Sequence, residues 1–301
     1  MERSSILLNS GTNEVEIVEF GIQKAALGIN VIKVKEIINA IEPISIPMSH
    51  PCLEGIIQLR GDIIPVIDLA KFLNFTPSVN FHDDKYIVAE FNQSIYAFHV
   101  HSVSRIHRLS WDMIEKPTDV AQNTQNCVIG IVRIEQRMIL LLDFERIMVD
   151  IAPEMGMPDL SRKISADVIA SDKGLVIAED SPMLRKLLLD YLPQIGYNNL
   201  TFFQDGRDAW KYLSEVADQY GANFSDKVSM LITDIEMPQM DGHFLTKSVK
   251  QHPVLKDLPV VIFSSLITDT LKHKGETVGA DAQVSKPEYE RLGELIKELC
   301  L

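Results

Sequence analysis

The sequence of 301 residues is poor in cysteine and lacks both a long apolar run and a concentration of basic residues. Cys52, Cys127 and Cys300 are scattered without paired spacing, which argues against a disulfide framework or a zinc site and favours a reducing compartment. Even the apolar run at 138–142 ends at Asp143, far short of the roughly 20 residues of a membrane helix. The N-terminus also lacks the basic and apolar regions of a signal peptide, so we expect a cytoplasmic protein.

The charge balance argues against nucleic-acid binding. The net charge of −13 divides into −8 over residues 1–172 (15 basic minus 23 acidic) and −5 over 173–301 (14 minus 19). Neither half shows the basic patch that contact with a phosphate backbone requires. A transcription factor of this type would also need a DNA-binding module beyond the C-terminal half, and we expect none.

Polar residues follow several apolar stretches of the C-terminal half at the points where predicted strands end. They are Glu179 and Asp180 after 174–178, Asp234 after 228–233, Ser264 after 259–263, and Lys286 after 282–285. Because the carboxyl ends of parallel strands meet at one edge of a sheet, we expect these groups to converge. Clustered carboxylates repel one another and need an oxygen-preferring cation, of which Mg²⁺ is the usual one. A carboxylate nucleophile beside Mg²⁺ and a lysine predicts a site that accepts a phosphoryl group.

In this order and at these strand ends, residues 173–301 resemble a response-regulator receiver domain. The resemblance implies that Asp234 is the phospho-acceptor, with Ser264 and Lys286 binding phosphoryl oxygens. It also implies a Mg²⁺ site made by Glu179, Asp180, Asp234 and the backbone carbonyl of Glu236. Taken singly, each residue has an ordinary structural role, such as a turn, a helix start or a surface lysine. Alternating strands and helices predict a flavodoxin-like parallel sheet of order 2-1-3-4-5.

Two residues depart from the usual receiver pattern. Gln283 stands three positions before Lys286, where an aromatic switch residue is common, so we expect the signal to leave the domain by another route. The Glu236 side chain, two residues after Asp234, is expected to shield a phosphoryl group from hydroxide, which predicts slow loss of phosphate.

The N-terminal half contains an internal repeat. Residues 55–73 align without gaps on residues 130–148, each with a glycine, two apolar stretches around a polar turn, an aspartate and a helical end. A predicted hairpin at 15–29 has a looser counterpart at 86–98, and apolar residues at helical spacing over 31–38 predict one or two helical turns. We therefore predict an all-β domain of two small five-stranded barrels.

Residues 15–150 resemble the CheW-like coupling domain of bacterial chemotaxis. The resemblance rests on VIKVKEI at 31–37, the segment 42–47 and above all EGIIQLRGDIIPVIDL at 54–69. It implies a docking surface, and Arg60 at the tip of a strand turn is the predicted partner contact rather than a solvated turn residue. We expect a disordered lead over 1–14 and a linker over 151–172, which is marked by prolines, glycine and serines.

Two histidines of this half allow a metal hypothesis. His99 and His101 alternate on a predicted strand, as metal ligands can, but no third ligand of suitable spacing is apparent. The favoured interpretation is a pair of partly exposed imidazoles.

A coupling domain followed by a receiver is similar to CheV-type chemotaxis coupling proteins. The resemblance implies a scaffold, not an enzyme, that links chemoreceptors to a histidine kinase at receptor arrays on the inner face of the membrane. Phosphorylation of Asp234 would modulate the output. One alternative is a phosphate sink that drains the kinase and is localised by the coupling domain. A remote alternative is a phosphohydrolase, because Asp234-Ile-Glu236 loosely resembles the Asp-x-Asp of haloacid-dehalogenase-type enzymes.

Overall fold

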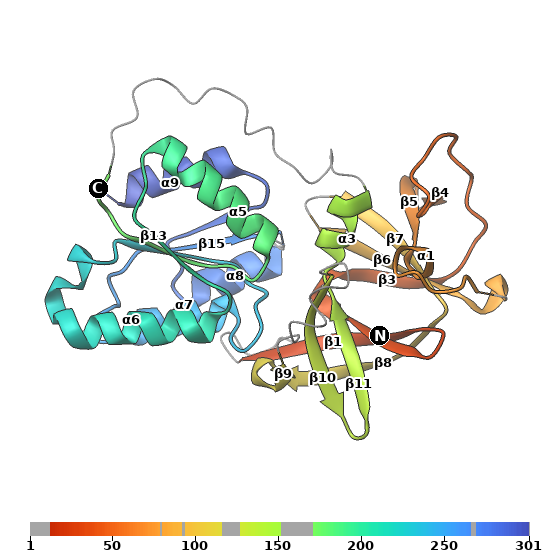
Figure 1. Cartoon of the computed structure of the whole chain (residues 1–301), viewed down its shortest axis with the longest axis horizontal. Coiled ribbons are helices and arrows are strands. Elements are labelled where there is room, and N and C mark those ends of the chain that lie inside the picture. Colours follow the sequence, from red (N-terminus) through yellow and green to blue (C-terminus); the bar gives the residue numbers. More distant parts are fainter. Residues whose placement is uncertain are drawn as a thin grey trace. The chain divides into compact units, whose positions relative to one another are not determined.

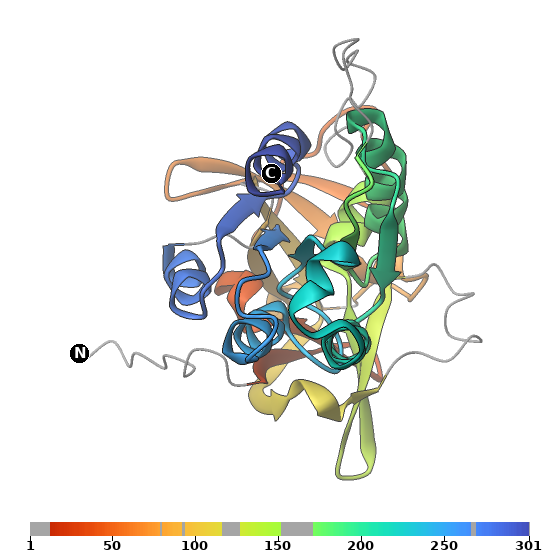
Figure 2. The same ribbon diagram turned by 90° about the vertical axis from the view of Figure 1, so that its left-hand side faces the viewer.

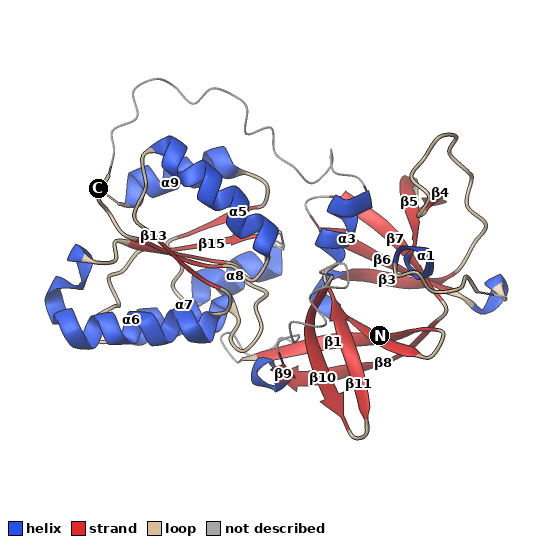
Figure 3. Cartoon of the chain, viewed as in Figure 1, coloured by secondary structure: helices blue, strands red, loops and turns tan. Residues whose placement is uncertain are grey.

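The chain divides into two compact units. The computed structural model describes residues 13–78, 80–91, 94–115, 127–151, 171–265 and 269–300 (Figure 1). One unit spans Val15–Met157 and is rich in strands, and the other contains Pro158–Leu301 and has the α/β pattern (Figure 3). Except at their edges, the predicted lead over 1–14 and linker over 151–172 lie outside the described residues. Among the helices that the structure describes, none is long and apolar enough to span a membrane.

The β-rich unit contains two sheets. The first sheet has the order β8-β1-β2-β11-β10-β9, from strands β1 (Glu14–Ile22), β2 (Ala25–Asn30), β8 (Ser102–Ser110), β9 (Ile114–Glu115), β10 (Val128–Ile134) and β11 (Arg137–Leu142). The second sheet has the order β3-β6-β7-β5-β4, from strands β3 (Val34–Asn39), β4 (Leu53–Leu59), β5 (Asp62–Asp68), β6 (Lys85–Phe91) and β7 (Ser94–Val100). Two strand-rich sheets are therefore present as predicted. The first sheet has six strands rather than five, because the short β9 pairs with β10.

The helical prediction over 31–38 is wrong beyond its first turn. A 3₁₀ turn covers Val31–Lys33, and β3 then begins at Val34. Ile37 and Ile38 lie in register with Ile87 and Tyr86 of β6. β-Branched residues fit a pleated surface well, so pairing with β6 outweighs the local helical spacing.

The repeat found in the sequence forms equivalent structures in the two sheets. Strands β4 and β5 lead into α1 (Leu69–Phe72), and β10 and β11 lead into α3 (Phe144–Ile151). Both hairpins carry a register shift at their glycine, Gly55 or Gly130. Asp68 caps α1 by accepting from the Lys71 N–H at 2.8 Å, and Asp143 accepts from the corresponding N–H of α3 at 3.0 Å.

The first sheet is not formed by one continuous segment of the chain. Its strands β1 and β2 come before the second sheet in the sequence, and its strands β8 to β11 come after it. β11 pairs in parallel with β2, so the last hairpin of the unit joins the first hairpin of the chain. β5 pairs in parallel with β7 in the same way. Parallel neighbours need a long connection, and here the connection between β2 and β11 contains the whole second sheet, followed by β8, β9 and β10.

Phe144 at the start of α3 packs against both sheets. Its ring centroid lies 6.1 Å from that of Phe20 in β1 and 4.5 Å from that of Phe98 in β7, both edge to face. All three side chains are buried in one apolar cluster that draws on both sheets. Helix α3 is thus a central part of the core of this unit.

Phe144→Ala should lower the free energy of unfolding of the β-rich unit by about 3–5 kcal/mol, because it leaves a cavity between two well-packed rings. Urea unfolding of the whole chain, followed by amide hydrogen exchange in β1 and β7, measures this. Met138→Ala is the matched control: its side chain is 59% exposed on the neighbouring strand β11, so the change should stay within about 0.5 kcal/mol. Equal effects of the two substitutions would contradict the role of α3.

The α/β unit has the predicted five-stranded parallel sheet. Its order is β13-β12-β14-β15-β16, from β12 (Leu175–Ala178), β13 (Leu200–Phe203), β14 (Met230–Thr233), β15 (Val260–Ser264) and β16 (Ala282–Ser285). The order 2-1-3-4-5 is confirmed. The helices are α5 (Pro182–Tyr191), α6 (Gly206–Tyr220), α7 (Gly242–Gln251), α8 (Asp269–Thr277) and α9 (Tyr289–Leu299).

Helices cover both faces of this sheet, as Figure 2 shows from the side of this unit. Helices α5 and α9 pack on the face that carries Ile177 and Ile232. Helices α6 and α7 pack on the face that carries Val176 and Leu231. Because both faces are buried, the strands β12, β14 and β15 are apolar and polar residues appear only where these strands end.

Candidate functional site

Asp234 directly follows β14 at the carboxyl edge of the parallel sheet. Its N–H donates to the carbonyl of Ala178 at 2.9 Å, and its Oδ1 accepts from the N–H of Ile235 at 2.6 Å. A side chain at Gly242 could not fit beside it, since a Cβ there would lie 1.8 Å from the Asp234 carbonyl oxygen. The turn after β14 therefore requires glycine at this position.

Lys286, which follows β16, joins the ends of three strands. Its Nζ lies 2.7 Å from Oε2 of Glu179 and 2.9 Å from Oδ2 of Asp234. The Lys286 side chain is only 3% exposed, and both carboxylates are buried as well. A buried ammonium is stable only with close anionic partners, so these contacts determine where the side chain lies.

Glu179 and Asp180 lie between β12 and α5. Ser181 caps α5 by accepting from the Leu184 N–H at 3.4 Å, and its own N–H donates to Oε1 of Glu179 at 3.1 Å. From the first turns of α5, Arg185 donates to the carbonyl oxygens of Glu179 and Asp180 at 2.8 and 2.9 Å. Arg185 was not predicted as a site residue, because its position in the helix gives no sign that its guanidinium turns back to these carbonyls.

The three acids form an anionic cluster that suits a hard cation. Carboxylate oxygens of Glu179, Asp180 and Asp234 lie within 4.8 Å of one another. Burial raises the pKa of Glu179 to about 7, with the charge of Asp234 acting in the same direction and that of Lys286 opposing it. Three carboxylates against one ammonium leave a net negative charge, and an all-oxygen donor set fits Mg²⁺.

The remaining predicted residues lie as follows. Ser264 is the buried last residue of β15, in register with Ser285, and its carbonyl accepts the Lys286 N–H at 3.0 Å. Glu236 is buried in the turn after Asp234. Gln283 donates from Nε2 to the Lys272 carbonyl of α8 at 2.7 Å. The structure thus gathers Glu179, Asp180, Asp234 and Lys286 at the edge where β15 also places Ser264.

Arg60 belongs to the β-rich unit, in the turn between β4 and β5. Its side chain is 77% exposed and pairs with Glu36 of β3 at 2.8 Å. Its positive φ of 53° is matched at Glu135, the equivalent turn residue between β10 and β11. The Arg60 guanidinium is therefore oriented by Glu36 of β3 while remaining accessible.

The expectation that His99 is a partly exposed imidazole is wrong. Its ring is buried, with Nδ1 2.8 Å from Oε1 of Glu54 and Nε2 3.0 Å from Oδ2 of Asp84. His101 is partly exposed, and its Nδ1 accepts from the Gln23 N–H at 3.0 Å. Within the described ranges, clustering of potential metal ligands identifies Glu179, Asp180 and Asp234 and does not include the histidines.

Comparisons with known proteins cover both units. Residues 16–152 match the family model of the CheW-like domain, and residues 175–298 match that of the response regulator receiver domain. Chemotaxis protein CheV3 of Helicobacter pylori is 32% identical over 300 residues, which cover 95% of each chain. Chemotaxis protein CheV2 of the same organism is 27% identical over 285 residues, 90% of this chain and 88% of that protein. Chemotaxis protein CheW of Thermotoga maritima is 29% identical over 153 residues, 50% of this chain and 98% of its own length.

Lys286→Met should lower the free energy of unfolding of the α/β unit by about 3–5 kcal/mol in a chelator, because it leaves buried carboxylates without their cation. Added Mg²⁺ should restore part of this loss, since it binds the folded acid cluster. Urea unfolding in chelator and in Mg²⁺ measures both effects. Lys211→Met, at an exposed position of α6, is the control and should be nearly neutral in both conditions. An Mg²⁺ effect of the same size in the two variants would count against the cluster as the metal site.

Proposed function

Since this chain belongs to the CheV family of chemotaxis proteins, we propose that Asp234 accepts a phosphoryl group from a histidine kinase and thereby modulates coupling by the CheW-like domain. The chain is a chemotaxis coupling scaffold with a phosphorylatable receiver domain. The observation that supports Asp234 as the acceptor is its shared contact with Lys286, which also holds Glu179 at the carboxyl edge of the sheet.

The residues around Asp234 fit the magnesium ion that receiver domains generally bind. Glu179, Asp180 and Asp234 supply carboxylate oxygens, and the backbone carbonyl of Glu236 is the further proposed ligand. Mg²⁺ held there would neutralise negative charge on an incoming phosphoryl group and so lower the repulsion between two anions.

The protein side chains then have separate tasks. A carboxylate oxygen of Asp234 attacks the phosphorus in line, so that an O–P bond forms while the P–N bond to the imidazole of the kinase breaks. The departing imidazole takes a proton from solvent. Lys286, 2.9 Å from Oδ2 of Asp234, is placed to bind a phosphoryl oxygen, and the hydroxyl of Ser264 is proposed to bind another.

Asp234→Asn should abolish labelling by phosphoramidate or by a phosphorylated kinase, because an amide is not a phosphoryl acceptor. In the unchanged chain, labelling should require Mg²⁺. Asp257→Asn, an exposed position outside the site, should label normally. Phosphate incorporation measured with Mg²⁺ and with chelator checks both statements. Equal labelling of the unchanged chain in the two conditions would contradict the proposed metal site.

A phosphate sink remains the second candidate within signalling. In that case Asp234 would drain the kinase, and the CheW-like domain would serve only to keep the receiver nearby. Loss of Asp234 would then prolong kinase phosphorylation without changing how the scaffold binds its partners. Coupling measured with Asp234→Asn separates the two functions.

The phosphohydrolase alternative is disfavoured by the position of the nucleophile. In haloacid-dehalogenase-type enzymes the nucleophile follows the first strand of the fold. Asp234 follows β14, which comes after β12 and β13 in the chain. This position agrees with the match to the receiver family model.

The proposed partners are chemoreceptor cytoplasmic domains and the histidine kinase, at receptor arrays on the inner face of the membrane. The CheW-like domain supports this proposal, because the CheW and CheV families have a coupling role. Arg60 is the proposed contact residue. Its exposed guanidinium, oriented by Glu36, can form a further charge-assisted hydrogen bond with a partner.

Arg60→Glu should weaken binding of receptor or kinase, because it reverses an exposed charge and places it beside Glu36. Stability should change by about 0.5 kcal/mol or less. Glu135→Lys tests the same left-handed turn position on the first sheet and should leave the binding unchanged. Affinity by calorimetry and stability by urea unfolding are the readouts. Unchanged affinity of Arg60→Glu for both partners would refute the contact.

A further inference from the structure

Gln283 of β16 and Gly275 of α8 form a close contact in the α/β unit. Nε2 of Gln283 donates to the Lys272 carbonyl of α8 at 2.7 Å. A Cβ at Gly275 would lie 2.3 Å from Oε1 of Gln283, so a larger residue there would displace the amide. Glycine is unfavourable inside a helix, and here it allows α8 to lie directly on the Gln283 side chain. A polar side chain thus joins the last strand of the sheet to α8.

Helix α8 also adjoins the first turn of α7. His243 is fully buried there, and burial lowers the pKa of its imidazole to about 3, with the charge of Lys274 acting in the same direction. The nearby backbone of Leu271 opposes this shift. Burial raises the pKa of Asp241 to about 6, and the charge of Lys274 opposes that rise. Leu271 and Lys274 of α8 therefore lie beside the start of α7, where Asp241 caps the helix.

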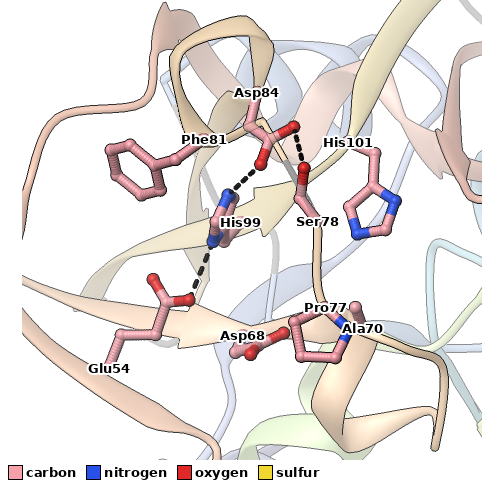
Figure 4. Close-up of a pocket in the computed structure, with 9 residues that line it drawn as sticks. All are labelled: Glu54, Asp68, Ala70, Pro77, Ser78, Phe81, Asp84, His99 and His101. Atoms are coloured by element: carbon pink, nitrogen blue, oxygen red, sulfur yellow. Dashed lines mark hydrogen bonds and ion pairs between the residues drawn. The ribbon is translucent and has the colours of Figure 1, made fainter.

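The polar side chains in contact with α8 are not fully paired. Oε1 of Gln283 and both ring nitrogens of His243 are buried and lack a hydrogen bond of good geometry to any described residue. By contrast, the buried ring of His99 in the second sheet has both nitrogens paired with carboxylates (Figure 4). Because an unpaired buried polar atom is costly, the contacts of α8 are incomplete in this arrangement. A shift of α8 would open these atoms to water or to new partners.

Strand β16 and helix α7, which contact α8, also position the candidate site. β16 leads directly into Lys286, three residues after Gln283. Helix α7 begins at Gly242, which lies against the Asp234 carbonyl. A displacement of Lys286 or Asp234 therefore reaches α8 through an element that the helix contacts.

We infer that Gln283 is a positioning residue that couples α8 to the phosphoryl site through its hydrogen bond to Lys272. The coupling rests on the proposed phosphorylation of Asp234. Lys286 must leave Oδ2 of Asp234 to bind a phosphoryl oxygen, and the resulting shift of β16 moves the Gln283 amide and with it α8. This route needs no aromatic side chain at position 283, so it explains how a signal leaves a receiver that has glutamine there.

Amide hydrogen exchange of α8 in the full chain, in Mg²⁺ with and without beryllofluoride, tests this coupling. Fluorine NMR reports separately whether beryllofluoride is bound. We expect beryllofluoride to change the exchange rates of α8 amides about fivefold or more, the lower limit of typical allosteric coupling. In Gln283→Met, which keeps the side-chain length but loses the donor, the ratio of the two rates should approach unity. A merely structural role would change exchange equally in both states and leave the ratio unaltered.

Gly275→Ala tests the same contact from the helix. Alanine favours the helix but displaces the Gln283 amide, so the ratio should fall as in Gln283→Met. The two substitutions together should have no further effect, because each removes the same contact. Gln219→Met, at an exposed position of α6, is the matched control and should respond like the unchanged chain. Gln283→Glu, whose carboxylate cannot donate to the Lys272 carbonyl, serves if Gln283→Met does not fold.

Two results would overturn the coupling alone. They are bound beryllofluoride without a change in α8 of the unchanged chain, and a full response of α8 in both Gln283→Met and Gly275→Ala. Labelling of Asp234 at the usual rate should accompany the lost response in these variants, because the site itself stays intact. A fluorine spectrum without bound beryllofluoride in the unchanged chain would instead reject the proposed phosphorylation of Asp234, and the coupling with it.

Discussion

The buried ammonium of Lys286 is the interaction on which the α/β unit depends. It lies between the carboxylates of Glu179 and Asp234, and each of these three residues comes from the end of a different strand. An unpaired charge at this depth would be costly, so the ends of β12, β14 and β16 must keep their register for the contacts to form. The same constraint holds the Asp234 carboxylate at the site proposed for phosphoryl transfer and maintains a negative cluster that a cation can complete. Folding and chemistry therefore place demands on the same three side chains.

The β-rich unit illustrates how a repeated architecture can acquire different surfaces. Both sheets use the same hairpin, the same glycine bulge and the same aspartate cap. They differ at other equivalent positions of the repeat. Arg60, in the turn of the second sheet, corresponds to Glu135 in the turn of the first sheet, and Glu54 of β4 corresponds to Ile129 of β10. Differences of this kind, on a shared backbone, identify positions at which the common fold does not dictate the residue.

Much of the receiver site could be predicted because its signal is local. Each apolar strand ends in a polar residue, and the edge common to parallel strands brings such residues together without knowledge of side-chain packing. Arg185 could not be predicted, because its contacts depend on how α5 leaves the sheet. The pairing of β2 with β11 could not be predicted from the sequence either, because the whole second sheet lies between these two strands in the chain. His99 was misjudged because its partners, Glu54 and Asp84, lie 45 and 15 residues away in the sequence.

The most direct test of a phosphorylation-controlled scaffold is the affinity of a chemoreceptor–kinase assembly for the full chain, with and without beryllofluoride and Mg²⁺. Beryllofluoride stands in for the phosphoryl group on Asp234, and the Asp234→Asn chain provides the control that cannot respond. Coupling of about 1–3 kcal/mol, typical of allosteric proteins, predicts that the mimic changes the affinity roughly 5- to 150-fold in the unchanged chain only. An affinity and a kinase activity identical in both states would contradict such control and leave the receiver as a phosphate sink.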